Sequence, residues 1–321
     1  MLKRMSIRKI IVASFTLVIL FVLYLIPIKN DEYELELKTD KIEYVYPNNL
    51  AVIYLLDSND YVARTLITSC NCETEEKAKD LLEGLIIDGK KSNIIPNGFR
   101  SIIPSGTSIN DISLEEGVLT IDFSKELLEV KSNFEEKMIE SIIYTLTSIE
   151  GIDKVIIKVE GKQLERLPYS KKIIPTILDK DYGINKSYEL VSINDIDSYT
   201  LYYVNSYNEN YYYVPVTKYI NNNSQDKIKV IIEELSTSPV YESNLMSFLN
   251  VSTKLLDYEI VDNTLKLNFN NLLLSDVTSN NILEEVIYTV GLSMGDNLNV
   301  DEVVFLVENE EIYKFFPKSI E

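Results

Sequence analysis

The chain carries the same sequence unit twice, and this duplication limits what it can fold into. Residues 99–123 align without a gap on residues 245–269 at an offset of 146, with apolar residues matching along the alignment. Other segments of the two copies match at offsets between 144 and 150. Offsets that drift by a few residues indicate equivalent elements joined by loops of slightly different length. The sequence therefore predicts two domains of one fold in tandem.

Hydropathy patterning predicts the order β-β-α-β-β-α-β within each copy. Runs of β-branched and aromatic residues bounded by turn residues favour an initial strand pair, at 51–56 and 61–67 in the first copy and at 200–204 and 211–216 in the second. Apolar residues on one helical face favour a helix over 75–87. The predicted fold class is therefore α+β: two tandem copies of a small module in which helices cover one face of a sheet.

A second helix is expected later in each copy. In the first copy we expect it to begin near Ser132-x-x-Glu135, because this spacing is typical of a capping box. Residues 140–146 then match residues 284–290 of the second copy at an offset of 144. The alignment superposes a Tyr-Thr pair of one helix on a Tyr-Thr pair of the other, and we expect both pairs to pack in the core.

Two polar turns occupy the same place in the two copies. Glu116-Gly117 of the first copy aligns with Asp262-Asn263 of the second. Glycine and asparagine are the residues that best tolerate a positive φ, so the alignment predicts a tight turn between two strands in each copy.

An apolar stretch near the N-terminus predicts a membrane anchor. Residues 10–28 contain no charge and, as a helix, would span about 28 Å of hydrocarbon. Basic residues precede the stretch and acidic residues follow it, which places the N-terminus in the cytoplasm. A cleaved signal peptide is the alternative, although the stretch is longer than usual and lacks a small-x-small cleavage site. The expected location is the plasma membrane, with the tandem domains outside the cytoplasm.

The chain is expected to consist of six segments. They are a cytoplasmic tail (1–9), a transmembrane anchor (10–28), an acidic stalk (29–48), a first domain (49–168), a connector (169–198) and a second domain (199–317).

The charged residues exclude several classes of function. The chain has no histidine, which rules out Ser-His-Asp and Cys-His relays and the HExxH zinc site. Its net charge of −19 argues against nucleic-acid binding, which depends on Lys and Arg. A pair of carboxylates could still hydrolyse glycosides, and Asp122 with Glu160 is the candidate pair, but Asn268 replaces the aspartate in the second copy. We therefore expect no catalytic residue and no enzyme.

Cys70 and Cys72 are the only cysteines. Outside the cytoplasm they could form a disulfide, whereas a metal site would lack the further Cys or His ligands that zinc normally takes. The ten glycines are scattered and form neither a Walker nor a GxGxxG loop. No metal and no cofactor are expected.

Seven of the 22 tyrosines lie between residues 199 and 213. Tyrosine combines a large apolar ring with a polar tip and suits a protein interface. The candidate partner surface is Tyr202, Tyr203, Tyr211, Tyr212 and Tyr213. Two alternatives remain: the tyrosines of the hairpin pack alternately against the helices, or they form a sugar-binding platform.

The two copies resemble the GerM domain of sporulation and spore-germination proteins, and the first copy carries the motif more fully. The resemblance lies in a turn at 103–107, a strand at 117–124, a helix end at 144–147 and a strand at 154–161. The second copy departs from the motif at Asn250, Ser252, Asn268 and Asn309. The resemblance implies a non-enzymatic, membrane-anchored protein of endospore formation or germination, with domains similar to the ring-building modules of secretion-type channels.

The resemblance also implies where such a protein acts. We expect an assembly or scaffolding component beside the channel between mother cell and forespore, in the intermembrane space of sporulating cells, with envelope or sporulation-channel proteins as partners. The alternative is a cell-wall glycan-binding module with peptidoglycan as its partner, and a carboxylate-dependent wall hydrolase is the third hypothesis.

Overall fold

The computed structural model describes residues 14–18, 21, 49–221, 225–237, 243–276 and 280–319. Residues 1–45 and 46–321 form two separate units. The predicted tail (1–9), the stalk (29–48) and most of the anchor (10–28) lie outside the described residues, apart from a helical piece at 14–18 and 21. Within the ranges given above, no helix combines the length and the apolar character needed to cross a bilayer.

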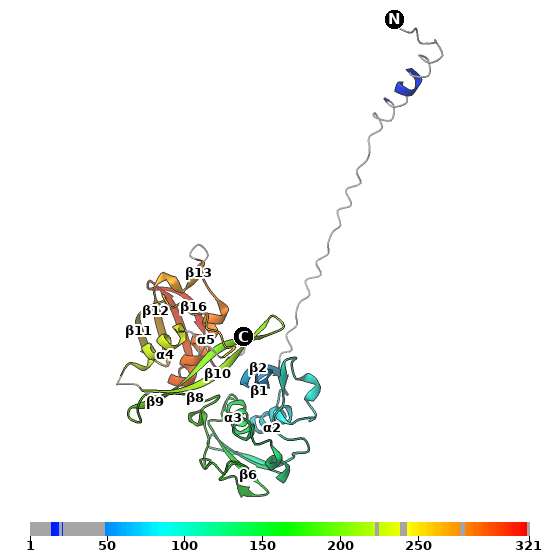
Figure 1. Ribbon diagram of the computed structural model, residues 1–321, viewed down its shortest axis with the longest axis vertical. Helices are drawn as coiled ribbons and strands as arrows, with labels where there is room; N and C mark the ends of the chain where they lie inside the picture. Colours follow the sequence, from blue (N-terminus) through cyan, green and yellow to red (C-terminus); the bar gives the residue numbers. More distant parts are fainter. Residues whose placement is uncertain are drawn as a thin grey trace. The chain divides into compact units, whose positions relative to one another are not determined.

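Both copies follow the order β-β-α-β-β-α-β that the sequence predicts. The first copy comprises β1 (Leu50–Asp57), β2 (Val62–Thr68), α2 (Thr74–Leu85), β4 (Ile109–Glu115), β5 (Val118–Phe123), α3 (Glu135–Leu146) and β6 (Lys154–Val159) (Figure 1). The second comprises β9 (Ile196–Tyr207), β10 (Asn210–Asn221), α4 (Lys227–Ser236), β11 (Leu255–Val261), β12 (Thr264–Phe269), α5 (Glu284–Leu298) and β15 (Glu302–Val307).

Short elements complete the two copies and the connector. They are β3 (Phe99–Arg100), β7 (Lys162–Gln163), β8 (Ser187–Glu189), β13 (Leu274–Asp276), β14 (Asn281–Ile282) and β16 (Glu310–Phe315), with 3-10 turns at Ser92–Ile94, Lys125–Glu129, Lys180–Tyr182 and Asn271–Leu273.

The strands of each module lie in two different sheets. Each copy has its own four-stranded sheet, β4-β5-β6-β7 in the first and β11-β12-β15-β16 in the second. The two N-terminal hairpins instead share one six-stranded sheet, in which β2 of the first copy pairs with β10 of the second. The prediction of a single sheet per module was therefore wrong, because the hairpin belongs to a sheet that joins the copies.

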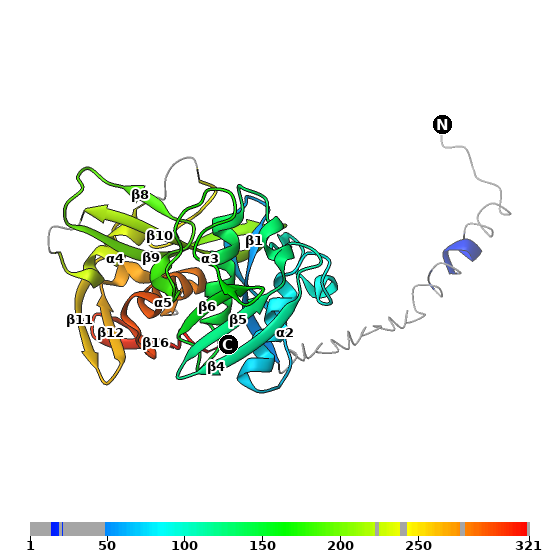
Figure 2. The ribbon, with the colours of Figure 1, turned by 90° about the horizontal axis from the view of Figure 1, so that it is seen from below.

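Helix α3 explains why the module needs two sheets. The helix lies between β1 and β6 (Figure 1; Figure 2 shows the same elements from below), and ten of its 12 residues are buried. Small polar side chains of α3 bond to the hairpin: Ser141 Oγ donates to the backbone oxygen of Tyr54 at 2.5 Å, and Thr145 Oγ1 accepts from the backbone N–H of Tyr54 at 3.0 Å. A helix buried on two sides must satisfy its polar groups internally, and these bonds do so.

The apolar core forms one cluster in each copy, and the clusters meet at the shared sheet. Ala63 of β2 belongs to the cluster of the second copy, and Phe99 packs against both clusters. The two copies therefore bury apolar surface against each other and are not joined by the connector alone.

The internal alignment of the second helix was wrong by one helical turn. The backbone N–H of Tyr54 bonds to Thr145, and in the second copy the backbone N–H of Tyr202 bonds to Ser293 Oγ at 2.9 Å. These equivalent bonds set the offset of the helices at 148, whereas the alignment gave 144. A slip of four residues leaves apolar side chains on the same helical face, so the hydropathy pattern does not detect it.

The local turn and cap predictions had different outcomes. Both predicted turns are confirmed, with φ of 79° at Gly117 and 64° at Asn263. The predicted capping box is absent: the N-cap is Phe134, and the carboxylate of Glu135 accepts from the connector backbone at Tyr169 (2.8 Å) and Ser170 (3.0 Å). Glu135 therefore holds the connector in place instead of capping the helix.

Candidate functional site

Three of the five tyrosines predicted to form a partner surface are buried. Tyr202 and Tyr203 are 1% exposed and Tyr212 is 7% exposed, whereas Tyr211 is 52% exposed and Tyr213 is half-buried. The prediction was wrong for the buried three because the hairpin β9–β10 does not present a face to solvent: residues 199–205 are all buried, as in a strand covered on both faces.

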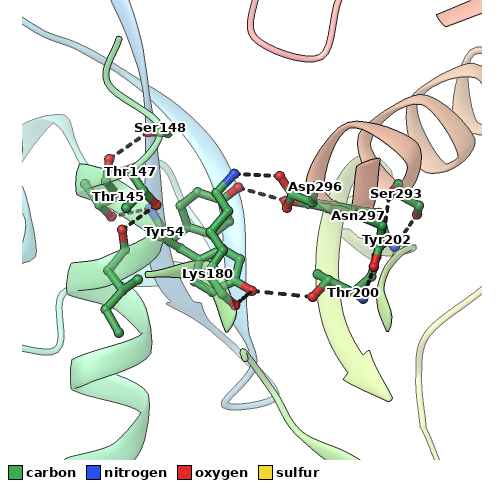
Figure 3. Close-up of polar contacts among 12 residues, drawn as sticks. Tyr54, Thr145, Thr147, Ser148, Lys180, Thr200, Tyr202, Ser293, Asp296 and Asn297 are labelled. Carbon is green, nitrogen blue, oxygen red and sulfur yellow. Dashed lines mark hydrogen bonds and ion pairs between the residues drawn. The ribbon is translucent and has the colours of Figure 1, made fainter. Parts of the chain in front are cut away.

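Tyr202 meets Tyr54 of the first copy at the junction between the two copies (Figure 3). The hydroxyls of Tyr54 and Tyr202 lie 2.9 Å apart, and Tyr202 Oη donates to Asp296 Oδ2 at 2.6 Å. Since the single hydroxyl proton of Tyr202 goes to the carboxylate, Tyr54 is the donor to Tyr202. Lys180 Nζ of the connector lies 2.5 Å from the other oxygen of Asp296. Residues of both copies and of the connector thus share one polar network.

The charges of this network stabilise one another. Burial raises the pKa of Tyr202 well above its ordinary value, and the neighbouring charge of Asp296 adds to the effect. Burial alone would lower the pKa of Lys180, but the Asp296 carboxylate outweighs it and the net shift is upward. The tyrosine therefore stays a neutral donor and the lysine a cation at neutral pH, which is the chemistry of a structural link.

A second polar link uses the carboxylate of Asp57, which is fully buried. Its Oδ2 accepts from Asn205 Nδ2 at 3.0 Å and from Tyr212 Oη at 2.8 Å, both in the second copy. Its Oδ1 accepts from the backbone N–H groups of Asn59 and Tyr61 at 2.8 Å each, within the β1–β2 turn. A buried carboxylate with four donors is well compensated, so Asp57 joins its own turn to the second hairpin.

Asn185 of the connector completes the pairing between the hairpins. Pro215 in β10 has no N–H and so offers no donor to β2. Asn185 lies at this point: its Nδ2 donates to the backbone oxygens of Val62 and Pro215, each at 2.8 Å, and its Oδ1 accepts from the Val62 N–H at 3.0 Å. The Asn185 side chain therefore replaces the backbone hydrogen bond that Pro215 cannot make in the shared sheet.

A cavity of about 400 Å³ lies beside the connector. Its lining includes Tyr61, Glu136, Glu140, Lys172, Lys186 and Tyr188. Lys186 Nζ lies 2.6 Å from Glu136 and 3.4 Å from Glu140, so its ammonium bridges the two carboxylates. Glycoside hydrolysis needs a water or a sugar between its carboxylates, and here a lysine contacts both.

The two glutamates of the cavity differ in their electrostatics. Burial would raise the pKa of Glu136, but hydrogen bonds and charges from Lys172 and Lys186 hold it below its usual range. Burial dominates at Glu140 and raises its pKa, while its Oε2 accepts from the backbone N–H of Asn185 at 3.0 Å. Both carboxylates are thus committed to contacts within the protein.

The predicted carboxylate pair Asp122 and Glu160 makes structural contacts instead. Asp122 Oδ1 accepts from the backbone N–H of Gly161 at 2.8 Å, and Glu160 Oε1 accepts from that of Lys125 at 3.1 Å. The second copy keeps the first of these bonds through other residues, because Asn268 Oδ1 accepts from the N–H of Asn309 at 2.9 Å. The departures of the second copy from the motif at these two positions therefore preserve one turn.

Cys70 and Cys72 form a disulfide within one loop. The backbone N–H of Cys70 donates to Asp80 Oδ2 at 2.9 Å, and Ser69 Oγ donates to the same oxygen at 2.9 Å. The loop is therefore fixed to helix α2. The part of the chain that the structure describes holds no cluster of three or more metal-binding side chains.

The edge strands of the two copies differ. In the first copy α2 contacts β4, and Glu75 accepts from the backbone N–H of Leu114 at 2.7 Å. In the second copy β11 pairs with β12 at one edge, and it exposes Leu256 (50%), Ile260 (50%) and Val261 (44%). Ile260 occupies the position of Leu114. The second copy therefore exposes three aliphatic side chains on its edge strand, beside the acidic Asp257 and Glu259.

Sequence reasoning missed Tyr54, Asp57, Lys180, Asn185 and Asp296. A usable signal was present for two of them. An offset of 148 in the first hairpin aligns Tyr54 with Tyr202 and Asp57 with Asn205. The other three depend on contacts of the connector and of the end of α5, which no local pattern indicates.

Comparisons with known proteins agree with the duplication. Residues 52–165 and 200–313 match the sequence model of a family described as "Germane: Sporulation and spore germination". Over 272 residues the chain is 33% identical to the spore germination protein GerM of Bacillus subtilis (strain 168), covering 83% of this chain and 73% of that protein. The solved structure of the tandem GerMN domains of the sporulation protein GerM from Bacillus subtilis is similar, with a TM-score of 0.74 and 31% identity, over 81% of this chain and 91% of that one.

Proposed function

This chain belongs to the Germane family of sporulation and spore germination proteins, and from that premise we propose that it is a non-enzymatic assembly component of the envelope of a spore-forming bacterium. In this proposal residues 10–28 anchor the chain in the plasma membrane, and the tandem domains act outside the cytoplasm, in the intermembrane space of sporulating cells. Their neighbours are envelope or sporulation-channel proteins, and the modules serve as ring-building units.

The observation that carries the proposal is the exposure of three aliphatic side chains on the edge strand β11. Leu256, Ile260 and Val261 expose about half of their surface on a strand that has a sheet partner at one edge. Soluble proteins usually cover or charge such an edge, because it can pair with a strand of another chain. Strand β11 does carry Asp257 and Glu259, but most of its side chains are exposed, including the three aliphatic ones. The equivalent strand of the first copy is protected by α2, so the second copy offers a site for strand addition that the first does not.

The junction between the copies supports an assembly role as well. Tyr54, Asp57 and Asn185 join the two hairpins in one sheet. A rigid pair of domains presents β11 in a fixed direction, as a building unit requires. An enzyme of the carboxylate type would need two free carboxylates, whereas Glu136 and Glu140 both contact Lys186.

Site-specific photocrosslinking in sporulating cells tests the proposal. A photoreactive residue at Ile260 should form an adduct with an envelope protein, identified by mass spectrometry. The matched control is Leu128, an exposed leucine of the first copy outside any strand, where the same adduct should not form. Adducts at Ile260 with peptidoglycan alone, or no adduct at all, would contradict an assembly role for β11.

The cavity beside the connector favours the glycan-binding alternative. Tyr61 and Tyr188 line it together with charged groups, and aromatic rings commonly stack on sugars. If the alternative holds, purified peptidoglycan should retain the protein, and replacing Tyr188 with Ala should abolish retention. Under the assembly proposal the Tyr188→Ala variant still forms the Ile260 adduct.

A further inference from the structure

Residues 190–196 of the connector, which we call the aliphatic loop, contain four exposed aliphatic residues. Val191 is 94% exposed and Ile193 is 91% exposed, and Leu190 and Ile196 are also exposed. A single exposed aliphatic residue is ordinary on a protein surface. Four exposed aliphatic residues within seven positions are unusual, and concentrations of exposed apolar groups commonly mark an interaction site.

Asn221, the last residue of β10, fixes the backbone of the aliphatic loop. Its Oδ1 accepts from the backbone N–H groups of Val191 (2.8 Å) and Ser192 (3.1 Å). Its Nδ2 donates to the backbone oxygens of Ser192 (3.0 Å) and Asn194 (2.7 Å). The exposed side chains thus stand on a backbone held by four hydrogen bonds, and a preorganised loop loses less conformational entropy when it binds.

Aromatic and charged contacts stabilise the strands next to the aliphatic loop. Strand β8 runs parallel to the end of β10. Tyr188 and Tyr219 stack across these strands with ring centroids 4.8 Å apart. Lys218 Nζ lies 3.1 Å from Glu189 and 2.8 Å from Glu234. These contacts hold the loop at one end of the long hairpin.

The charge around the loop indicates the kind of partner it fits. Asp195 and Asp197 flank the aliphatic side chains, whereas Glu189 forms an ion pair with Lys218. Acidic flanks disfavour an anionic lipid surface, and the net charge of −19 disfavours a second copy of the chain. An apolar pocket with a rim of Lys or Arg on another protein is complementary both to the aliphatic side chains and to the acidic flanks.

The loop lies between the two segments that match the family, 52–165 and 200–313, so the shared domain fold does not account for it. We propose that the aliphatic loop docks into an apolar, basic-rimmed pocket of a protein partner. This contact is separate from strand β11, and it holds or fails independently of the role proposed for that strand.

Photocrosslinking of the full chain in its own cells tests this docking. A photoreactive residue replaces Ile193, and the crosslinked peptide is mapped by mass spectrometry. We expect a peptide of another protein that is apolar and flanked by Lys or Arg. The matched control is Val251, which is 75% exposed and should not give this adduct. An adduct with lipid, with peptidoglycan or with a second copy, a partner peptide without basic residues, or no adduct would each overturn the proposal.

Two variants test the roles of the exposed aliphatic side chains and of the acidic flank. With the photoreactive group at Leu190, the double substitution Val191→Ser and Ile193→Ser should reduce the adduct at least tenfold. Asp195→Asn should lower the yield at least twofold by removing one acidic flank, and asparagine suits the φ of 52° at this position. Unchanged yield in both variants would overturn the proposal, because neither aliphatic contact nor charge would then contribute.

Discussion

The hydroxyl of Tyr54 lies 2.9 Å from the hydroxyl of Tyr202, the residue at the equivalent position of the other copy. Asp57 and Asn205 are equivalent at the same offset of 148, and they too are hydrogen-bonded, at 3.0 Å. A residue can meet its own counterpart only near a twofold axis, as in an isologous dimer. The two copies are therefore arranged as a pseudo-symmetric dimer fused in one chain.

Removing single tyrosine hydroxyls should show how much each hydrogen bond of this junction contributes to the free energy of unfolding. Tyr54→Phe loses one neutral hydrogen bond and should cost about 1 kcal/mol of unfolding free energy, whereas Tyr202→Phe also deprives Asp296 of a donor and should cost about 2 kcal/mol. Urea unfolding of residues 46–321 measures both. Tyr211→Phe is the matched control in the same hairpin, since its ring is half exposed and the substitution should change little. Equal losses of unfolding free energy in Tyr54→Phe and Tyr202→Phe would contradict the assignment of Tyr54 as the donor to Tyr202.

Asn185 should be the connector residue on which the shared sheet depends most. Asn185→Ala removes three hydrogen bonds to Val62 and Pro215 and should cost about 3 kcal/mol, because the buried N–H and carbonyl groups lose their partner.

The backbone of Asn185 has a φ of 44°, so alanine adds strain that glycine does not. Asn185→Gly should therefore be less destabilised than Asn185→Ala, and its residual cost reports the lost side-chain bonds. If glycine restored full stability in thermal unfolding, the side chain would not support the sheet.

Local features of the fold could be predicted from the sequence, whereas features that depend on pairing between the copies could not. The turns at Gly117 and Asn263 follow from residues that tolerate positive φ, and both are observed. The tyrosines of the second hairpin look like a surface cluster because nothing in the local sequence shows that β2 pairs with β10. That pairing buries Tyr202 and Tyr212 and turns an expected interface into an internal junction.

The candidate carboxylates likewise combine features that the sequence predicts with contacts that only the folded structure shows. Asp122 lies on β5 and Glu160 directly follows the neighbouring strand β6, but their backbone partners appear only in the folded turn. Glu136 and Glu140 lie one turn apart on α3 and could have been paired by spacing alone. What decides their role is Lys186, which the connector brings between them.

Glu136 and Glu140 should give opposite pH dependences. The pKa of Glu136 is lowered from 4.5, so the stability it contributes is present above pH 4.5 and is lost as the pH falls through its folded pKa. The pKa of Glu140 is raised from 4.5, so its contribution is largest below pH 4.5 and is lost as the pH rises through its folded pKa.

Glutamine variants separate the two effects. Relative to the wild type, Glu136→Gln should lose stability at pH 7 and approach wild-type stability near pH 3. Glu140→Gln should compare more favourably with the wild type at pH 7 than at pH 4. Urea midpoints across this range provide the measurement. Parallel curves for both variants would show that Lys186 does not distinguish the two carboxylates.

The turn that follows β6 should accept the residues of the second copy. Gly161 has a φ of 74°, and no atom lies within 4 Å of the position that a Cβ would occupy there, while Asn309 adopts a φ of 71° at the equivalent place. The double substitution Asp122→Asn and Gly161→Asn recreates the bond seen between Asn268 and Asn309.

We expect this double variant to unfold within about 0.5 kcal/mol of the wild type, because the acceptor and the tolerated φ are both kept. Asp122→Ala, which removes the acceptor, should cost about 1 kcal/mol. Thermal unfolding compares the two, with Asn268→Ala as the matched change in the second copy. If the double variant were as unstable as Asp122→Ala, then the two turns would not be equivalent and the bond from Asp122 would need its charge.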